Sequence, residues 1–281
     1  MFIHAIILTI SAFVGYQMSR GGDLVDNNYY VMNYYDKEMI LDHLDEKGIV
    51  LLKGYGKKVD TPRKFINLMR TFGTVDPIVS GTPPYLKNNI IHSPGFNTTT
   101  NHSMFNMSFT KYYTRIVKDP GDEIAFGEGW HSDLTYLCKP PYISAIRAIE
   151  LPENITHTAF RDMRKFYKKL PEIIRDGVQD MVVNHTDGVG RWCKHNAVKE
   201  INKEKTIYSN GAFARHAIDD KHTGFFQMLM WQLLNGTIYD SFNVTWGKDD
   251  VLMWDNRIVQ HSAIYDYPKD SRREIHRVIV N

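Results

Sequence analysis

The chain has 281 residues and a formal net charge of +2, with 43% hydrophobic and 23% charged residues. A chain of this length and composition can bury a substantial core, and its nearly balanced charge excludes the basic surface typical of nucleic-acid-binding proteins. No low-complexity linker or internal repeat interrupts it, so we expect a single domain over residues 1–281.

The N-terminal segment AIILTISAFVGY is apolar but too short to span a membrane comfortably. It has the length of a signal-peptide core, yet no lysine or arginine precedes it. We therefore interpret residues 1–16 as a first β-strand rather than a signal segment, and expect no stable membrane insertion. N-x-S/T sequons, which are glycosylation acceptors in secreted proteins, favour secretion instead. They begin at Asn97, Asn101, Asn106, Asn154, Asn184, Asn235 and Asn243. The sequence favours the cytoplasm, with the ER lumen or secretory pathway as the alternative.

Helix signals mark the next region of the chain. Asp36 can cap a helix over residues 37–47 that ends at Gly48. The apolar run 49–55 indicates a buried strand. Thr61 and Pro62 then open a second helix over residues 63–72.

A polar region rich in Asn, Thr, Gly and Pro, from about 80 to 120, is predicted to be a long loop or lid. Helices are expected beyond it over residues 160–169, 171–181 and 224–234, and strands around His131 and over residues 142–149, 250–255, 258–261 and 274–280. Strands toward both ends with helices between them predict a mainly β fold with flanking α-helices, a barrel or jelly roll.

Three side chains are candidate metal ligands. His131 and Asp133 lie in GWHSDLTY, and His261 lies in WDNRIVQHSA. Two imidazoles and one carboxylate form the facial triad that holds non-haem Fe(II) and leaves coordination positions open. On a β-strand, residues i and i+2 share a face, so a strand here would direct His131 and Asp133 to one metal ion. The sequence therefore predicts an iron site at these three catalytic residues.

Two arginines follow in RREIHRVIV. Arg273, Ile275, Arg277 and Ile279 alternate along one face of the last predicted strand. If the isoleucines face inward, so do the arginines, and a buried guanidinium requires an anionic partner. Two inward arginines therefore predict two anions in the pocket.

The segments WHSD, GKDDVLMWDNRIVQH and RREIHRV resemble the signature regions of the taurine dioxygenase (TauD/TfdA) family of Fe(II)/2-oxoglutarate-dependent dioxygenases. The resemblance covers most of the chain. It implies a double-stranded β-helix of the clavaminate synthase-like type, with iron held by the three candidate ligands. It also implies that 2-oxoglutarate chelates the iron, that Arg273 and Thr158 bind its far carboxylate, and that Arg277 binds an anionic group of the substrate. O2 is the implied oxidant, with ascorbate as a reductant.

Two departures from the family pattern bear on the substrate. A histidine expected after the helix ending RTFG is absent from TVDPIVSG, and an asparagine before WHxD is replaced by the GEG of Gly127–Gly129. Taurine itself is therefore not the expected substrate. The carboxylate of Asp133 is present, and the related halogenases lack it, so halogenation is not expected.

The implied activity is oxidation of a C–H bond in a small anionic molecule that is carboxylate-, sulfonate- or amino-acid-like, with release of succinate and CO2. Hydroxylation is the default outcome, and desaturation or oxidative cyclisation in natural-product biosynthesis stays open. The alternatives are a protein or peptide side-chain hydroxylase and, from another class, a zinc-dependent hydrolase using the same site. A homo-oligomer is compatible with the sequence.

Other polar and aromatic residues have less specific interpretations. Cys138 and Cys193 lack CxxC spacing, and of a disulfide and two ordinary thiols we expect the thiols. Trp130 is expected to form a core or pocket wall, and Trp254 and Asn256 to shape the turn leading to His261. Structural or exposed positions are expected for His157, His185, His195, His216 and His276.

Overall fold

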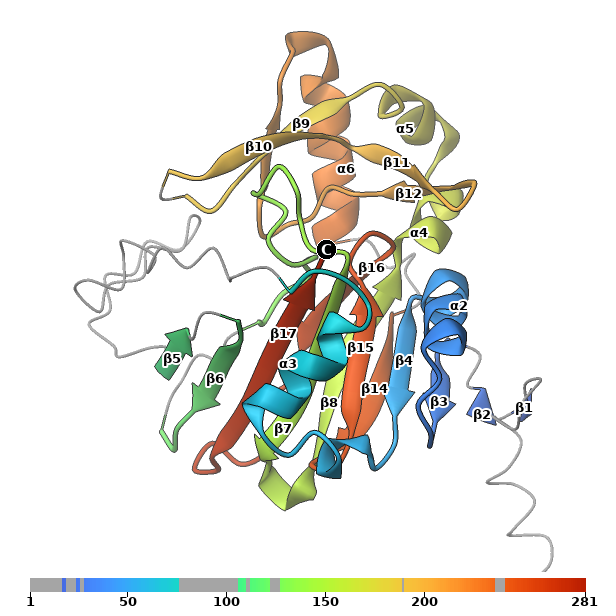
Figure 1. The fold of residues 1–281 in the computed structure, drawn as a ribbon. Coiled ribbons are helices and arrows are strands. Elements are labelled where there is room, and N and C mark those ends of the chain that lie inside the picture. The colour runs from blue at the N-terminus through green and yellow to red at the C-terminus, as the bar shows by residue number, and fades with distance from the viewer. Residues whose placement is uncertain are drawn as a thin grey trace, which may run out of the picture.

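A computed structural model of the chain describes residues 17–18, 24–25, 28–75, 106–109, 112–121, 127–188, 190–235 and 241–281. It has a body of long strands and, above it, a second region of shorter strands and helices (Figure 1). The predicted first strand at residues 1–16 lies outside the described residues, as does the part of the predicted lid from 80 to 105.

The body is built on a nine-stranded sheet, with strand order β1-β2-β3-β4-β15-β7-β17-β6-β5. Its pairs are antiparallel except for the parallel pair β3 and β4. The strands are β1 (Gln17–Met18), β2 (Leu24–Val25), β3 (Tyr30–Met32), β4 (Ile49–Leu52), β5 (Asn106–Phe109), β6 (Thr114–Lys118), β7 (Ile143–Glu150), β15 (Val251–Asp255) and β17 (Arg273–Val280). Because β5 and β6 form an edge hairpin, the C-terminal part of the predicted lid is sheet instead of loop.

A three-stranded sheet, in the order β14-β8-β16, packs against the inner face of the larger one. Its strands are β8 (Ile155–Asp162), β14 (Ser241–Gly247) and β16 (Val259–Ala263). The core between the sheets joins Phe160 and Trp246 of the smaller sheet to Trp254 and Ile275 of the larger one, all nearly fully buried. This core lies beneath the candidate site, so the site is built on the rigid centre of the protein.

Two helices cover the outer face of the larger sheet, as α3 does in Figure 1. They are α2 (Lys37–Lys47) and α3 (Pro62–Arg70). The predicted caps are confirmed, because Asp36 accepts a hydrogen bond from the Met39 N–H and Gly48 has a φ of 79°. At α3 the Thr61 side chain accepts from the Lys64 N–H.

The second region combines helices and hairpins that the sequence prediction captured only in part. Its helices are α4 (Met163–Lys169), α5 (Glu172–Gly177) and α6 (Thr223–Asn235). Its strands are β9 (Val182–Thr186), β10 (Trp192–Asn196), β11 (Val198–Ile201), β12 (Glu204–Ile207) and β13 (Ala214–Ala217), and short 3-10 helices span Tyr55–Lys57, Pro152–Asn154 and Asp220–His222. No helix in the described ranges is long and apolar enough to cross a membrane.

The prediction of a helix over 160–169 is wrong in its first turn. Residues 160–162 complete strand β8, because Phe160 is fully buried in the core between the sheets. Asp162 then caps the helix by accepting from the N–H groups of Arg164 and Lys165. The predicted helix over 171–181 is also shorter than expected, since α5 ends at Gly177.

Candidate metal centre and cosubstrate pocket

The structure brings His131, Asp133 and His261 together in the interior. One possible ligand atom from each lies within 4.8 Å of the other two, and all three residues are buried. His131 and His261 form an isolated antiparallel bridge, with backbone N–O distances of 3.1 and 2.9 Å. The predicted strand at His131 is therefore wrong: it has one bridging residue, and Asp133 lies in the turn that follows.

Backbone hydrogen bonding sets the orientation of the His131 ring. Its Nδ1 lies 2.8 Å from the carbonyl oxygen of Gly129 and can donate to it. Its Nε2 then faces the triad, 3.9 Å from Oδ1 of Asp133. A hydrogen bond on one ring nitrogen is how proteins fix the tautomer of a metal-binding histidine.

Burial keeps both imidazoles in the form that can bind a metal. It lowers the pKa of His131, although the nearby Asp133 carboxylate raises it, and it lowers the pKa of His261 to about 3. Both rings are therefore neutral near pH 7, which leaves a nitrogen lone pair for a cation. Nδ1 of His261 is buried and has no hydrogen-bond partner in the described part of the chain.

The Asp133 carboxylate is ionised despite its burial. Burial disfavours its charge, but the Arg277 guanidinium beside it, aided by other neighbours including the Ser144 hydroxyl, holds its pKa at about 2. Arg277 Nη1 lies 2.5 Å from Oδ1, and Ser144 Oγ donates to Oδ2 at 2.6 Å. Arg277, predicted to bind the substrate, is thus an ion-pair partner of a candidate metal ligand here.

The residues predicted to bind 2-oxoglutarate lie on the two facing sheets. Arg273 on β17 is 3% exposed, and its guanidinium lies 5.5 Å from the centre of the Tyr265 ring. Within the described residues no carboxylate pairs with Arg273, and its buried Nε has no hydrogen-bond partner. Thr158 on β8 is buried, and its hydroxyl oxygen accepts from Nε1 of Trp246 at 3.1 Å. Because that oxygen already accepts, the Thr158 hydroxyl hydrogen can donate to an anion.

The residues fit the implied metal and cosubstrate. Two neutral imidazoles and one carboxylate are the donor set of mononuclear non-haem Fe(II) sites. Arg273, which has no counter-ion in the part of the chain that the structure describes, fits a carboxylate-bearing cosubstrate, because an uncompensated buried charge is costly. The inward direction predicted for the arginines agrees with the packing of Ile275, which lies between them on the same face, in the core between the sheets, and with the contact of Arg277 with Asp133.

The two cysteines correct another prediction. Cys138 and Cys193 form a disulfide, with their Cα atoms 5.2 Å apart, whereas the sequence favoured two thiols. The bond joins the segment just after the triad motif to β10 of the upper region. The two cysteines are 55 residues apart in the sequence, so their pairing could not be predicted from local spacing. The fold brings their two segments together.

Three other polar residues support the site and were not assigned to it from the sequence. Ser144 contacts Asp133 directly. Arg161 places its guanidinium 4.6 Å from the centre of the Trp130 ring and donates to Gln260, so it contacts the residue before His131 and the residue before His261. The position of Ser144, on a strand and facing inward with Ile146 and Ala148, carried the only sequence signal for its role.

The chain is similar to proteins of one known family. The family model described as "Taurine catabolism dioxygenase TauD, TfdA family" matches residues 26–279. An alpha-ketoglutarate-dependent sulfonate dioxygenase from Saccharomyces cerevisiae is 24% identical over 196 residues, which are 63% of this chain and 47% of that protein. An alpha-ketoglutarate-dependent 2,4-dichlorophenoxyacetate dioxygenase from a Burkholderia species is 28% identical over 53% of this chain and 56% of that protein. The matches thus span about half the length of these curated relatives.

Solved structures with the same fold include a taurine dioxygenase from Burkholderia xenovorans, with a TM-score of 0.61 and 19% identity over 89% of this chain and 85% of that one. AAD-2 in complex with Mn(II) and N-oxalylglycine aligns with a TM-score of 0.65 and 14% identity, over 91% and 95% of the two chains. The predicted jelly-roll fold is therefore confirmed.

Proposed function

The chain belongs to the TauD/TfdA family of dioxygenases, and from this premise we propose that it is an Fe(II)- and 2-oxoglutarate-dependent oxygenase acting on a small anionic molecule. The observation that carries the proposal is the buried cluster of His131, Asp133 and His261, together with the buried Arg273, which has no carboxylate partner among the described residues. The cluster supports a metal site, and the arginine supports a cosubstrate that brings its own carboxylate.

Each residue has a distinct part in the proposed reaction. His131, Asp133 and His261 would hold the metal, which with 2-oxoglutarate and O2 supplies an oxidant able to break a C–H bond while succinate and CO2 are released. Arg273 would bind the far carboxylate of 2-oxoglutarate, and the Thr158 hydroxyl would donate to the same group. The buried surroundings of the triad exclude water from the reacting groups.

The proposed anionic substrate is supported by the relatives, because Arg277, the second inward cation, already pairs with Asp133 of the triad and does not by itself require an anion from the substrate. Relatives named for sulfonate, alkyl sulfate and 2,4-dichlorophenoxyacetate act on compounds that carry an anionic group. We propose that Arg277 binds the corresponding group of the substrate. Hydroxylation at carbon is the expected outcome.

The test is succinate formation by the purified chain with Fe(II), ascorbate, 2-oxoglutarate and a panel of sulfonates, alkyl sulfates and carboxylates. We expect at least one of these classes to stimulate succinate release. His131→Ala should abolish it, whereas His216→Ala, which removes an exposed histidine on β13, should leave it unchanged. If no substrate class stimulates release above the uncoupled rate, the proposed substrate class is wrong.

We also propose that the chain works in an oxidising compartment of the secretory pathway instead of the cytoplasm that the sequence favoured. The Cys138–Cys193 disulfide supports this, because such bonds persist in oxidising compartments and are rare in the cytosol. Peptide mapping of the natural protein without reductant should recover the two cysteines as one linked peptide. Recovery of two free thiols from alkylated native material would contradict the proposed oxidising compartment. It would have no bearing on the proposed oxygenase activity.

A further inference from the structure

A closed network of hydrogen bonds holds Asp133 from behind. Its centre is Asn256, which lies in the turn between β15 and β16 and is 1% exposed. The side-chain oxygen of Asn256 accepts from the backbone N–H of Asp133 at 3.2 Å and from Nε1 of Trp254 at 3.0 Å. Its Nδ2 donates to Oγ of Ser144 at 2.7 Å. Asn256 therefore contacts the Asp133 backbone directly and its carboxylate through Ser144.

The network leaves Ser144 one direction in which to donate. A hydroxyl has a single hydrogen, and because Ser144 Oγ accepts from Asn256, that hydrogen is directed to Oδ2 of Asp133 at 2.6 Å. Ser144 is fully buried and lies opposite Trp254 in the register of β7 and β15, so it has no room to turn away. The other carboxylate oxygen, Oδ1, lies 3.9 Å from Nε2 of His131 and accepts from Nη1 of Arg277 at 2.5 Å.

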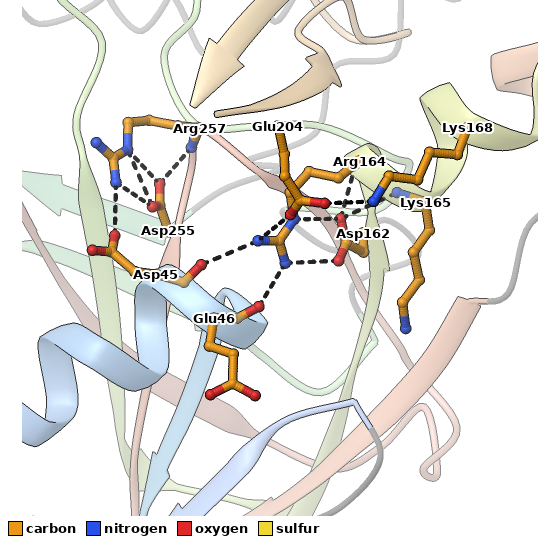
Figure 2. A network of polar contacts seen from close by, with 9 residues as sticks. All are labelled: Asp45, Glu46, Asp162, Arg164, Lys165, Lys168, Glu204, Asp255 and Arg257. Atoms are coloured by element: carbon orange, nitrogen blue, oxygen red, sulfur yellow. Dashed lines mark hydrogen bonds and ion pairs between the residues drawn. The ribbon is translucent and has the colours of Figure 1, made fainter. Parts of the chain in front are cut away.

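Ion pairs hold the turn that carries Asn256. Figure 2 shows Arg257 between the carboxylates of Asp255 and Asp45, and its Nη2 lies 2.7 and 3.3 Å from them. The Arg257 guanidinium also lies 3.8 Å from the centre of the Tyr142 ring, and the Asn256 N–H donates to the Tyr142 carbonyl at 2.9 Å. Asn256 is therefore fixed by its own neighbours, independently of any group bound at the triad.

We infer that Ser144 and Asn256 are positioning residues that fix the orientation in which the Asp133 carboxylate is presented to the metal. This inference rests on the proposed function. Ser144 holds Oδ2 and Asn256 holds the backbone N–H of Asp133, so the carboxylate cannot turn away from the triad without breaking a hydrogen bond. Partners of this kind orient a metal ligand and tune its affinity for the metal.

Anaerobic titration of the whole chain with Co(II), followed by absorption, tests the inference without turnover. Ser144→Ala should weaken binding about 10- to 100-fold, the usual effect of removing a partner of a metal ligand, and should alter the Co(II) absorption bands because Oδ2 is released. Ser132→Ala is the matched control. Its hydroxyl is equally buried and adjacent to both ligands, but it donates to the Val259 carbonyl instead of to Asp133.

Asn256→Asp is a second, isosteric variant in case Ser144→Ala fails to fold. A carboxylate at 256 cannot donate to Ser144 and would instead accept from it, drawing the hydroxyl away from Asp133. We expect the same loss of affinity and the same spectral change. A folded Ser144→Ala or Asn256→Asp protein with wild-type affinity and spectrum overturns the inference. Failure of the wild-type chain to bind Co(II), or binding that survives His131→Ala, would instead overturn the proposed metal site.

A separate observation concerns the outer face of the smaller sheet. Asn243 lies on β14, an edge strand, and is exposed, whereas the alternating residues Val244 and Trp246 are buried. It pairs in register with Ala159, the neighbour of Thr158, and so faces away from the pocket. A bulky group on Asn243 would leave the candidate site open.

Asn243 begins one of seven N-x-S/T sequons, and this number exceeds chance. The chain has 18 asparagines and 30 serines and threonines among 281 residues, so random placement gives about two sequons. The disulfide independently fits the compartment in which asparagines of such sequons are modified. We propose that Asn243 carries an N-linked glycan, which would also shield the edge strand β14 from pairing with another chain.

Peptide mapping of the full chain expressed in eukaryotic cells tests this proposal. Treatment with peptide-N-glycosidase in heavy-oxygen water should convert Asn243 to labelled aspartate, and Thr245→Ala should abolish the label at this position. Asn196→Gln, which changes an exposed strand asparagine outside any sequon, should not affect it. An unmodified peptide containing Asn243 would overturn the proposal and leave the metal site untouched.

Discussion

Arg273 and Arg277 lie four residues apart on the inner face of β17, with Ile275 between them on that face, yet their surroundings differ. Arg277 pairs with the Asp133 carboxylate, whose other oxygen is held by Ser144. Arg273 is as deeply buried but has no carboxylate partner among the described residues. The difference indicates that the metal end of the pocket is neutralised within the protein, whereas the Arg273 end requires an anion from outside.

The largest expected effect comes from removing the unpaired arginine. Arg273→Met should weaken 2-oxoglutarate binding about a thousandfold, or about 4 kcal/mol, because a buried charge pair with the cosubstrate is lost. Metal affinity should stay within a factor of a few. Isothermal titration with Mn(II) and then 2-oxoglutarate separates the two constants, and equal losses in both would contradict the division of the pocket.

For the unfolding free energy of the metal-free protein we expect the opposite order, with a larger loss in Arg277→Met than in Arg273→Met. Arg277→Met leaves Asp133 buried and without its cation, and should cost the metal-free protein about 3 kcal/mol of unfolding free energy. Arg273→Met removes a buried charge that has no carboxylate partner among the described residues, and it should be neutral or stabilising. Urea unfolding of both variants measures this, and a larger loss for Arg273→Met would reverse the comparison.

Removing the hydroxyl that completes the anion site should have a smaller effect. Thr158→Val keeps the shape of the side chain but removes a hydrogen bond to the cosubstrate carboxylate. We expect about tenfold weaker 2-oxoglutarate binding, or about 1.4 kcal/mol. Trp246 also loses its acceptor, so thermal unfolding serves as the control for a purely structural effect.

The smallest expected effect is a pH dependence of the Arg277 variant. In the wild type, Arg277 helps to hold the Asp133 pKa at about 2, so the pair persists throughout the range above pH 4. In Arg277→Met the largest lowering contribution is lost, and we expect burial to outweigh the remaining ones from Ser144 and the two histidines and to raise that pKa above its unfolded value. The folded variant then binds more protons than the unfolded chain, and its stability relative to wild type improves on acidification. Unfolding at pH 7, 6 and 5 should show the deficit shrinking by about 1 kcal/mol or less; a growing deficit would contradict the assignment.

Motifs with local chemistry could be predicted from the sequence, whereas long-range pairings could not. The caps of α2 and α3 and the inward face of β17 follow from local spacing, and the structure agrees. The hairpins from β9 to β13 were missed because strands such as WCKHN alternate polar residues without a clear apolar face. The Cys138–Cys193 bond and the Ser144–Asp133 hydrogen bond depend on segments that meet only in the folded chain.

The central claim is that the metal triad and Arg273 serve one reaction, in which the triad binds the metal and Arg273 binds the carboxylate of 2-oxoglutarate. Its most direct test is the absorption of the chain with Fe(II) under anaerobic conditions before and after 2-oxoglutarate is added. A metal-to-ligand charge-transfer band should appear in the wild type and in Arg277→Met. It should be lost in His131→Ala and require far more 2-oxoglutarate in Arg273→Met. No band in the wild type, or a band unchanged by His131→Ala, would contradict the account.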